Sequence, residues 1–291
     1  MKLKTLKTVL NHPLNKNQKT KAFFTLIKRA ILIRLHKYPI VYPFLNDTFL
    51  VVEKGMSSAE LQIYCTLYDY DEMLLMLHFL RDDDNFVDVG ANIGVYSVLA
   101  SGVAKAKSYS FEPIPSTFSR LKRNINYNNL NQKVKLFNNG VGDKNESLFF
   151  TNLLDAVNHV VKQESEQTLR VEVNTLDYFL EGSSAHFLKV DVEGFEAHVL
   201  KGAMQTIKNT ALKIVLIETN GLTSHYEFSD NFIHNTLVEN GFETYSYIPE
   251  KRELIKTNSQ NDTNTIYCRD IDFIKNRIQK APKITVGNKQ Y

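Results

Sequence analysis

The sequence predicts an α/β fold built on a mostly parallel sheet, with helices covering both faces of that sheet. From Asn85 onward, short apolar runs alternate with amphipathic stretches, which is the pattern of strands joined by crossover helices. The first run ends in an acid and a glycine turn, in the stretch NFVDVGANIGVYS (85–97). A later stretch rich in β-forming residues interrupts the alternation, as an inserted hairpin would.

Residues 1–60 are expected to form a basic arm that contains one helix. The first 46 residues hold ten Lys or Arg and no acid, so a basic arm precedes an acidic body. The polar, lysine-rich residues 1–19 predict a loose segment. Residues 20–37 carry apolar side chains at i, i+4 and i+7 and predict a helix, which the prolines of YPIVYPF (38–44) end. TFLVVEK (48–54) predicts a strand.

Residues 61–272 are expected to form the main domain. DYDEMLLMLHFL (69–80) predicts a helix with acids in its first turn, where the helix dipole favours them. The strands predicted after it are NFVDVG, AKSYSFEP, KVKLFNNGVG, HFLKVDVEG and LKIVLIETN. The helices predicted between them are VYSVLASGVAK, PSTFSRLKRNINYN and FEAHVLKGAMQTIKN. The inserted hairpin is expected at about 144–175.

The last part of the chain predicts one more helix and two strands. The helix covers about 230–240 and ends at Gly241, and the strands are FETYSYI and TIYCRD. Residues 273–291 are expected to be a basic tail.

The composition predicts a cytoplasmic, soluble protein that at most attaches to a membrane surface. The two cysteines, Cys65 and Cys268, offer no disulfide framework or metal spacing and are expected to stay reduced. We recognise no secretion signal, and no apolar run approaches the roughly 20 residues that span a bilayer.

The residues of the glycine turn indicate which of two classes of nucleotide-like ligand the site binds. A dinucleotide needs G-x-G-x-x-G, but Asn92 stands at the middle glycine and no glycine stands at the last position. Acids end three of the strands: Asp88, Glu112 and Asp191. Such a crevice disfavours a pyrophosphate and suits a cation. S-adenosylmethionine carries a sulfonium and an ammonium group, so we expect Asp88 to bind its ammonium and Glu112 to accept its ribose hydroxyls.

The motifs also resemble a known family, the FkbM S-adenosylmethionine-dependent methyltransferases. The resemblance covers roughly residues 69–220 and rests on FVDVGANIGVYS, SFEPIPSTFSRLKRNI, NNGVGDKN, VEVNTLDYFL, LKVDVEGFEAHVLKGA and IVLIETN, in that order. It implies the class I methyltransferase (Rossmann-like) fold, a seven-stranded and mostly parallel sheet with an antiparallel last strand, which TIYCRD fits. The hairpin insert and the N-terminal helical extension would be added to that fold.

The resemblance implies O-methylation of a sugar or polyketide hydroxyl, and it implies a set of cofactor contacts. It places the loop from Asn139 to Asp143 against the adenine. The cofactor-binding residues expected in this sequence are Asp88, Gly90, Ala91, Asn92, Gly94, Glu112, Pro113, Asn139, Val141 and Asp191.

Methyl transfer to a hydroxyl also needs a group that removes a proton. Strand alternation puts Lys189, Asp191 and Glu193 on one side, and Glu218 and Asn220 end the next strand. The expected catalytic residues are Lys189, Asp191, Glu193 and Glu218.

Two alternatives remain open at these strand ends. Glu193 could instead stabilise the start of the following helix. Asp191, Glu218 and Asn220 could bind a divalent cation such as Mg²⁺, which would acidify the acceptor. His159 and His225 are further candidates for the base.

The sequence therefore predicts an S-adenosylmethionine-dependent O-methyltransferase that acts on a saccharide in surface polysaccharide or glycoconjugate assembly. The alternatives are an N- or phosphate-directed methyltransferase of a small metabolite and a protein that holds the cofactor without turnover. The basic arm mixes lysines with Phe23, Phe24 and Ile27, which favours an anionic membrane surface over nucleic acid. No D/N-P-P-Y/F motif follows the fourth strand, which argues against base methylation.

Overall fold

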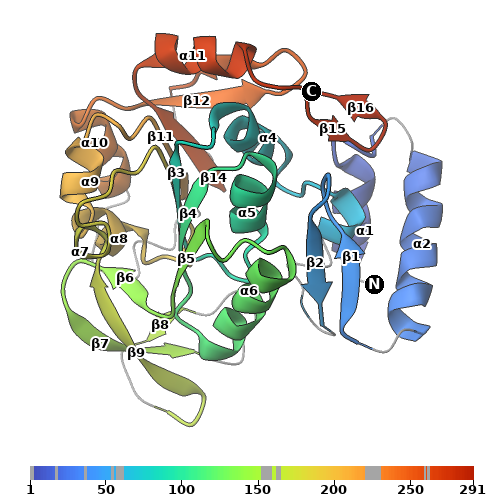
Figure 1. Cartoon of the computed structure of the whole chain (residues 1–291), viewed down its shortest axis with the longest axis horizontal. Coiled ribbons are helices and arrows are strands. Elements are labelled where there is room, and N and C mark those ends of the chain that lie inside the picture. Colours follow the sequence, from blue (N-terminus) through green and yellow to red (C-terminus); the bar gives the residue numbers. More distant parts are fainter. Residues whose placement is uncertain are drawn as a thin grey trace.

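A computed structural model describes residues 3–16, 19–35, 38–53, 56, 62–151, 159–161, 165–219, 231–258, 260 and 263–291. Its main feature is an eight-stranded sheet in the order β13-β12-β14-β11-β10-β3-β4-β5 (Figure 1). The strands in that order are Glu253–Lys256, Glu243–Ile248, Asn264–Cys268, Ile214–Glu218, Phe187–Val190, Asn85–Val89, Lys107–Phe111 and Val134–Phe137.

The sheet has the topology expected of a class I methyltransferase, with one strand more than predicted. Five neighbouring strands of this sheet are mutually parallel, namely β5, β4, β3, β10 and β11. Strand β14 runs antiparallel between β11 and β12. This confirms TIYCRD as the antiparallel strand. The eighth strand, β13, continues from β12 through a tight turn and pairs with it antiparallel at the sheet edge.

Helices cover both faces of the main sheet (Figure 1). In β3, Phe86 packs into the core on one face while Val87 packs into the core on the other, as strand alternation requires. The first face carries α4 (Tyr70–Phe79), α5 (Val95–Val98, continued by a π-turn at Leu99–Val103), α6 (Pro115–Tyr127) and α11 (Ile271–Gln279). The second carries α7 (Leu176–Phe179), α8 (Glu196–Lys201), α9 (Met204–Lys208) and α10 (Phe232–Glu239).

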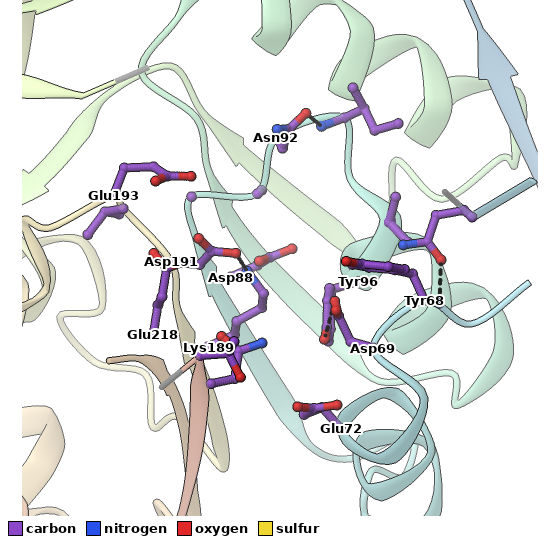
Figure 2. Close-up of a pocket in the computed structure, with 18 of the residues that line it drawn as sticks. Tyr68, Asp69, Glu72, Asp88, Asn92, Tyr96, Lys189, Asp191, Glu193 and Glu218 are labelled. Carbon is purple, nitrogen blue, oxygen red and sulfur yellow. Dashed lines mark hydrogen bonds and ion pairs between the residues drawn. The ribbon is translucent and has the colours of Figure 1, made fainter. Parts of the chain in front are cut away.

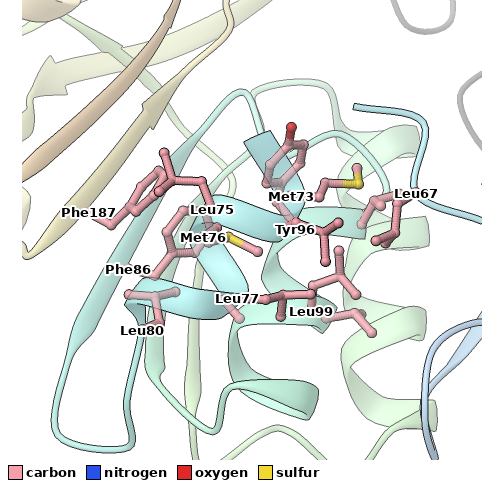
Figure 3. Close-up of a cluster of buried hydrophobic side chains, with 14 of the residues drawn as sticks. Leu67, Met73, Leu75, Met76, Leu77, Leu80, Phe86, Tyr96, Leu99 and Phe187 are labelled. Carbon is pink, nitrogen blue, oxygen red and sulfur yellow. The ribbon is translucent and has the colours of Figure 1, made fainter. Parts of the chain in front are cut away.

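Helix α4 is the most deeply buried of these helices and packs directly on the sheet. Met73, Leu74, Leu75 and Met76 are all fully buried. Figure 3 shows this helix over Phe86 and Phe187, with Leu99 of the neighbouring helix beside it. Because the helix is fixed by its own core, the acids in its first turn are held firmly at the edge of the sheet.

The insert forms a second sheet in the order β6-β9-β7-β8. Its strands are Gly140–Gly142, Thr168–Thr175, Glu146–Thr151 and Val160–Val161. A hairpin was predicted here; the structure has the antiparallel pair β7 and β9 with a third strand, β8, between them in the chain, which pairs with the other edge of β7. The prediction of one continuous strand KVKLFNNGVG was wrong, because the chain leaves the main sheet after Phe137 and β6 pairs with β9 instead.

The N-terminal segment is more ordered than predicted. Residues 1–19 were expected to be loose, but Leu3–Asn11 form α1, which buries Val9 in a small cluster with Leu26 and Cys65. The predicted helix is confirmed as α2 (Lys19–Leu35). Strand β2 (Phe49–Val52) is confirmed, and it pairs with a strand that was missed, β1 (Ile40–Pro43). Among the described residues, no helix is both long and apolar enough to cross a membrane.

Residues 273–291 do not form a tail. The expected boundary at 272 falls inside α11, and the chain ends in a hairpin of β15 (Thr285–Val286) and β16 (Lys289–Gln290). Ile274, Ile278 and Val286 are buried in the main core. Apolar side chains at these positions pack α11 against α4, which explains why the segment is structured despite its charge.

One buried amide connects the N-terminal hairpin to the glycine turn. Asn124 of α6 is fully buried; its Oδ1 accepts from the Val51 amide at 2.6 Å and its Nδ2 donates to the Ile93 carbonyl at 2.8 Å. Both partners are backbone groups that would otherwise be buried without a hydrogen bond.

We therefore expect Asn124→Ala to lower the free energy of unfolding by about 2–4 kcal/mol, since it leaves two buried backbone groups unsatisfied. Asn126 lies on the exposed side of the same helix, so Asn126→Ala should change stability by less than about 0.5 kcal/mol. Urea unfolding followed by circular dichroism measures both. Equal stability of the two variants would contradict this role of Asn124.

Candidate active site

The glycine turn after β3 holds the ends of three neighbouring strands close together. The amides of Gly90 and Ala91 both donate to the Phe111 carbonyl at the end of β4, at 3.1 and 2.9 Å. A Cβ on Gly90 would lie 1.8 Å from the Asp191 carbonyl oxygen, and its φ is +82°. Only glycine satisfies both conditions, so this position brings the loop after β10 against the turn.

Glu112 stabilises the turn from the end of β4. Its two carboxylate oxygens accept hydrogen bonds from the amides of Asn92 and Ile114, each at 3.0 Å. Asn92 itself has a φ of +51°, and its own Oδ1 accepts from the Ile93 amide at 2.8 Å. Burial raises the pKa of Glu112 to about 7. Glu112, which was predicted to bind the ribose, is therefore a buried carboxyl group that also shapes the loop.

Asp88 is buried at the end of β3, with one oxygen bound and one unbound. Its Oδ2 accepts from Ser97 Oγ at 2.6 Å, and Ser97 Oγ lies 2.7 Å from Ser110 Oγ. Within the described part of the chain its Oδ1 has no hydrogen-bond partner. Burial raises the pKa of Asp88. A buried carboxylate oxygen without a donor favours binding of a cationic ligand group.

Lys189 is a buried cation among these acids. It lies opposite Asp88 in the register of β10 and β3, and its Nζ donates to Asp191 Oδ2 at 2.9 Å. Burial alone would lower the pKa of Lys189, but the carboxylates of Asp191 and Asp88 raise it above its ordinary value. Its Nζ also lies 5.0 Å from the centre of the Tyr96 ring. Lys189 is therefore held as a charged ammonium group.

Glu218 and Glu193 approach Asp191 from the next strand end and the next loop. One carboxylate oxygen from each of the three lies within 4.8 Å of the others. Burial first, and then the charge of Asp191, raises the pKa of Glu218 well above its ordinary value. Its Oε2 is buried and has no hydrogen-bond partner among the described residues.

The helix after β10 is stabilised by Glu196 and not by Glu193. Glu196 Oε1 accepts from the amides of Val192 and Gly194 at 3.0 and 3.1 Å. Glu193 has a φ of +54° and lines the cavity. This observation favours the chemical interpretation of Glu193 over the capping interpretation.

These side chains surround one cavity of about 730 Å³. Figure 2 shows Asp88, Asp191 and Lys189 beside one another, with Glu193 and Glu218 on the same side. The predicted residues that line the cavity are Asp88, Gly90, Ala91, Asn92, Glu112, Pro113, Lys189, Asp191, Glu193 and Glu218.

Several lining residues were not predicted, and most come from segments before β3. Tyr68 and the acids Asp69, Asp71 and Glu72 lie at the start of α4, and His12 follows α1. Tyr96 Oη donates to Asp69 Oδ2 at 3.0 Å. The acids in the first turn of α4 were visible in the sequence, but their approach to the site depends on how that helix packs.

Three predicted cofactor contacts do not line this cavity. Val141 is buried in the core of the second face, because β6 belongs to the smaller sheet. Asn139 donates from Nδ2 to the Glu172 carbonyl at 3.4 Å. Gly94 begins α5 with a φ of +86°, and a Cβ there would lie 2.5 Å from Leu121. These positions shape the fold around the site. The neighbouring Asn138, which was not singled out, donates to the carbonyls of Glu112 and Pro113.

Two predictions lie outside the described residues, namely Asn220 as a metal ligand and His225 as a base. His159 is described and lies beside β8, where its amide donates to Thr151 Oγ1 at 3.0 Å. It does not line the cavity.

A model of the methyltransferase FkbM domain matches residues 88–244. The chain is 30% identical over 152 residues to the hexuronic acid methyltransferase AglP of Haloferax volcanii, covering 51% of this chain and 62% of that protein. It is 31% identical over 184 residues to Methyltransferase 1 of Beauveria bassiana, covering 54% of this chain and 73% of that protein.

Among solved structures, methyltransferase FkbM from Methylobacillus flagellatus aligns with a TM-score of 0.45 and 17% identity, over 73% of this chain and 55% of that one. The match to AglP spans less than two thirds of that protein. The matched domain begins at Asp88, at the end of β3, and includes the glycine turn and the acids at the ends of β4, β10 and β11. Because the FkbM domain match covers more than half of the chain and contains the acidic strand ends described above, the chain belongs to the FkbM methyltransferase family.

Proposed function

We propose that this protein transfers a methyl group from S-adenosylmethionine to a hydroxyl group of a saccharide, in surface polysaccharide or glycoconjugate assembly. The observation that carries this proposal is the pair of acids at the ends of β3 and β4. Asp88 presents a buried oxygen without a described partner, and the cofactor's ammonium would satisfy it. Each Glu112 oxygen holds one amide and keeps a second lone pair for a ribose hydroxyl.

The charge of the cavity supports this cofactor over a dinucleotide. Its acidic lining residues are Asp69, Asp71, Glu72, Asp88, Glu112, Asp191, Glu193 and Glu218, and Lys189 is the only lysine or arginine among the lining residues that the structure describes. A pyrophosphate would be repelled here, while a sulfonium and an ammonium group would be attracted.

A saccharide acceptor is supported by the similarity to a hexuronic acid methyltransferase. A carboxylate at the end of β11 supports an oxygen acceptor, because a sugar hydroxyl must lose its proton to attack the methyl group. A phosphate-directed enzyme would not need that base, because its acceptor is already an anion. A protein that holds the cofactor without turnover would not need a base at the position of Glu218.

Glu218 is the base that the geometry favours. Its raised pKa brings it nearer to neutrality, where a general base works best. Lys189 already neutralises Asp191 through a hydrogen bond of 2.9 Å, whereas the buried Oε2 of Glu218 has no hydrogen-bond partner among the described residues.

The same three carboxyl groups, Asp191, Glu193 and Glu218, are also a possible cation site. A divalent cation there would acidify the acceptor hydroxyl and take the place of the base. Removal of divalent cations with EDTA distinguishes catalysis by a bound cation from catalysis by Glu218 as the base.

We also propose that α2 contacts an anionic membrane surface. One side of this helix, with Ala22 and Leu26, is buried, while Phe23, Phe24, Ile27, Ile31 and Leu35 are exposed. Four lysines of the N-terminal segment are also exposed: Lys7 on α1, Lys16 between the two helices, and Lys19 and Lys28 on α2. Apolar side chains that enter the headgroup region and lysines that meet anionic lipids favour such a surface.

Replacing Asp88 tests the cofactor assignment. Asp88→Asn should weaken S-adenosylmethionine binding at least tenfold, since it removes a charged partner of the ammonium group. Asp82→Asn, at an exposed position beyond the opposite end of β3, should leave affinity unchanged. Isothermal titration calorimetry measures both variants, and unchanged affinity of Asp88→Asn would refute the contact.

Replacing Glu218 tests the base. Glu218→Gln should lower kcat by about 10²–10⁴ while the cofactor affinity stays the same. In the native protein, kcat should rise with pH as Glu218 ionises, and the midpoint should lie above the ordinary glutamate pKa of about 4.3 because the folded-state pKa is raised. The pH–rate profile in EDTA measures this. Loss of activity in EDTA that Mg²⁺ restores would assign Glu218 to a metal site instead.

Vesicle binding tests the membrane contact. The protein should sediment with vesicles of phosphatidylcholine and phosphatidylglycerol more than with phosphatidylcholine alone, and less at high salt. The double change Phe24→Ser with Leu35→Ser should remove most of this binding, because these side chains are 69% and 76% exposed. Val238→Ser, at a 45% exposed position on α10, should not. Equal binding to both vesicle types would contradict the proposal.

A further inference from the structure

The cavity has a second wall that lies outside the matched family domain. Residues 88–244 supply the glycine turn and the strand ends, whereas Thr8, Asn11 and His12 and residues 68–72 complete the lining from the other side. Figure 2 shows Asp69 and Glu72, from the start of α4, across the cavity from Asp191 and Glu218. Since the cofactor is assigned to Asp88 and Glu112, this wall faces the space left for the acceptor.

This second wall is acidic. Asp69 holds Tyr96 Oη at 3.0 Å, and burial raises its pKa. Burial also raises the pKa of Glu72 to about 7 and that of Asp71 to about 6. Burial is the largest cause of each rise, and the charges of Asp69 and Asp71 add to it for Glu72. A negative charge on a ligand beside them would raise these pKa values further, at a cost in binding free energy.

No described lining residue offers a positive charge to an anionic acceptor. Lys189 is 4% exposed and donates to Asp191. Both ring nitrogens of His12 are engaged, one with the Tyr68 carbonyl and one with the Leu14 amide.

The cofactor would not supply the missing positive charge for an anionic acceptor. Its sulfonium and ammonium charges would be offset by its own carboxylate and by Asp88. An acceptor with a carboxylate beside the reacting hydroxyl would therefore meet uncompensated acids on the α4 side.

We propose that the acceptor is a neutral sugar whose hydroxyl groups donate to Asp69 and Glu72, and that this wall rejects uronic acids. This inference rests on the proposed function, because it takes the remaining space in the cavity as the acceptor subsite. It differs from the acceptor that the name of the Haloferax relative describes, a hexuronic acid. The discriminating residues precede the domain that defines the family.

A matched pair of acceptors tests the proposal. p-Nitrophenyl β-glucoside and p-nitrophenyl β-glucuronide differ only at C6, where one has a hydroxymethyl group and the other a carboxylate. With radiolabelled S-adenosylmethionine, in EDTA and at about pH 8, where Glu72 is ionised, kcat/KM should be at least tenfold higher for the glucoside. Equal or faster methylation of the glucuronide, with or without added Mg²⁺, would overturn the proposal.

A variant tests whether the second wall causes the preference for the glucoside. Glu72→Gln keeps the size and the acceptor oxygen of the side chain but removes its charge, so the preference for the glucoside should fall at least threefold. The affinity for S-adenosylmethionine should not change. Glu239→Gln, at an exposed position on α10, is the matched control. An unchanged preference in Glu72→Gln would contradict the role of this wall.

Binding without turnover separates this inference from the proposed function. With the protein saturated with S-adenosylhomocysteine, saturation-transfer NMR compares the two glycosides directly. Preferential binding of the glucoside supports the wall even if neither sugar is methylated, a result that would refute only the proposed acceptor chemistry. Preferential binding of the glucuronide, or no binding of either glycoside, overturns the inference.

Discussion

The ion pair between Lys189 and Asp191 is the interaction on which the site depends. Four parallel strands end at one edge, and the acids there would repel one another strongly if no cation lay among them. Lys189 is buried in register with Asp88 and donates to Asp191, so it lets these acids stay close without all becoming neutral. Removing Asp191 would leave the buried charge of Lys189 without this partner, and the remaining site would be expected to rearrange.

The residues predicted best from the sequence are those whose position follows from strand geometry alone. Asp88, Glu112, Asp191 and Glu218 end neighbouring parallel strands, so they meet at one edge whatever the rest of the chain does. Asp69, Glu72 and Tyr96 could not be found in this way, because their approach depends on how α4 packs over Phe86. Asn139 and Val141 were misplaced since the chain leaves the main sheet after Phe137, and that exit carries no local signal. The N-terminal helix α1 was missed because its charge concealed the apolar side that buries Val9.

The architecture divides the work of the site between two parts of the chain. The strands and turns of residues 88–244 hold what a methyl donor needs. The opposite side is built by α4, which packs in the main core on the first face of the sheet, and by the residues that follow α1, which packs in a small cluster of its own. A change in the second part would alter which molecule is recognised while leaving the donor side intact. This separation explains how one fold can serve many acceptors.

The hydrogen bonds of the Glu112 carboxyl group should respond when a nucleoside fills the pocket. It holds the amides of Asn92 and Ile114, and the same oxygens are those we assign to the ribose. A nucleoside that donates to either oxygen would change the hydrogen bonds of both backbone N–H groups, since the two oxygens belong to one carboxyl group. Their proton resonances and their exchange with deuterated solvent would thus register the filling of the pocket from within the loop, without a probe attached to the ligand.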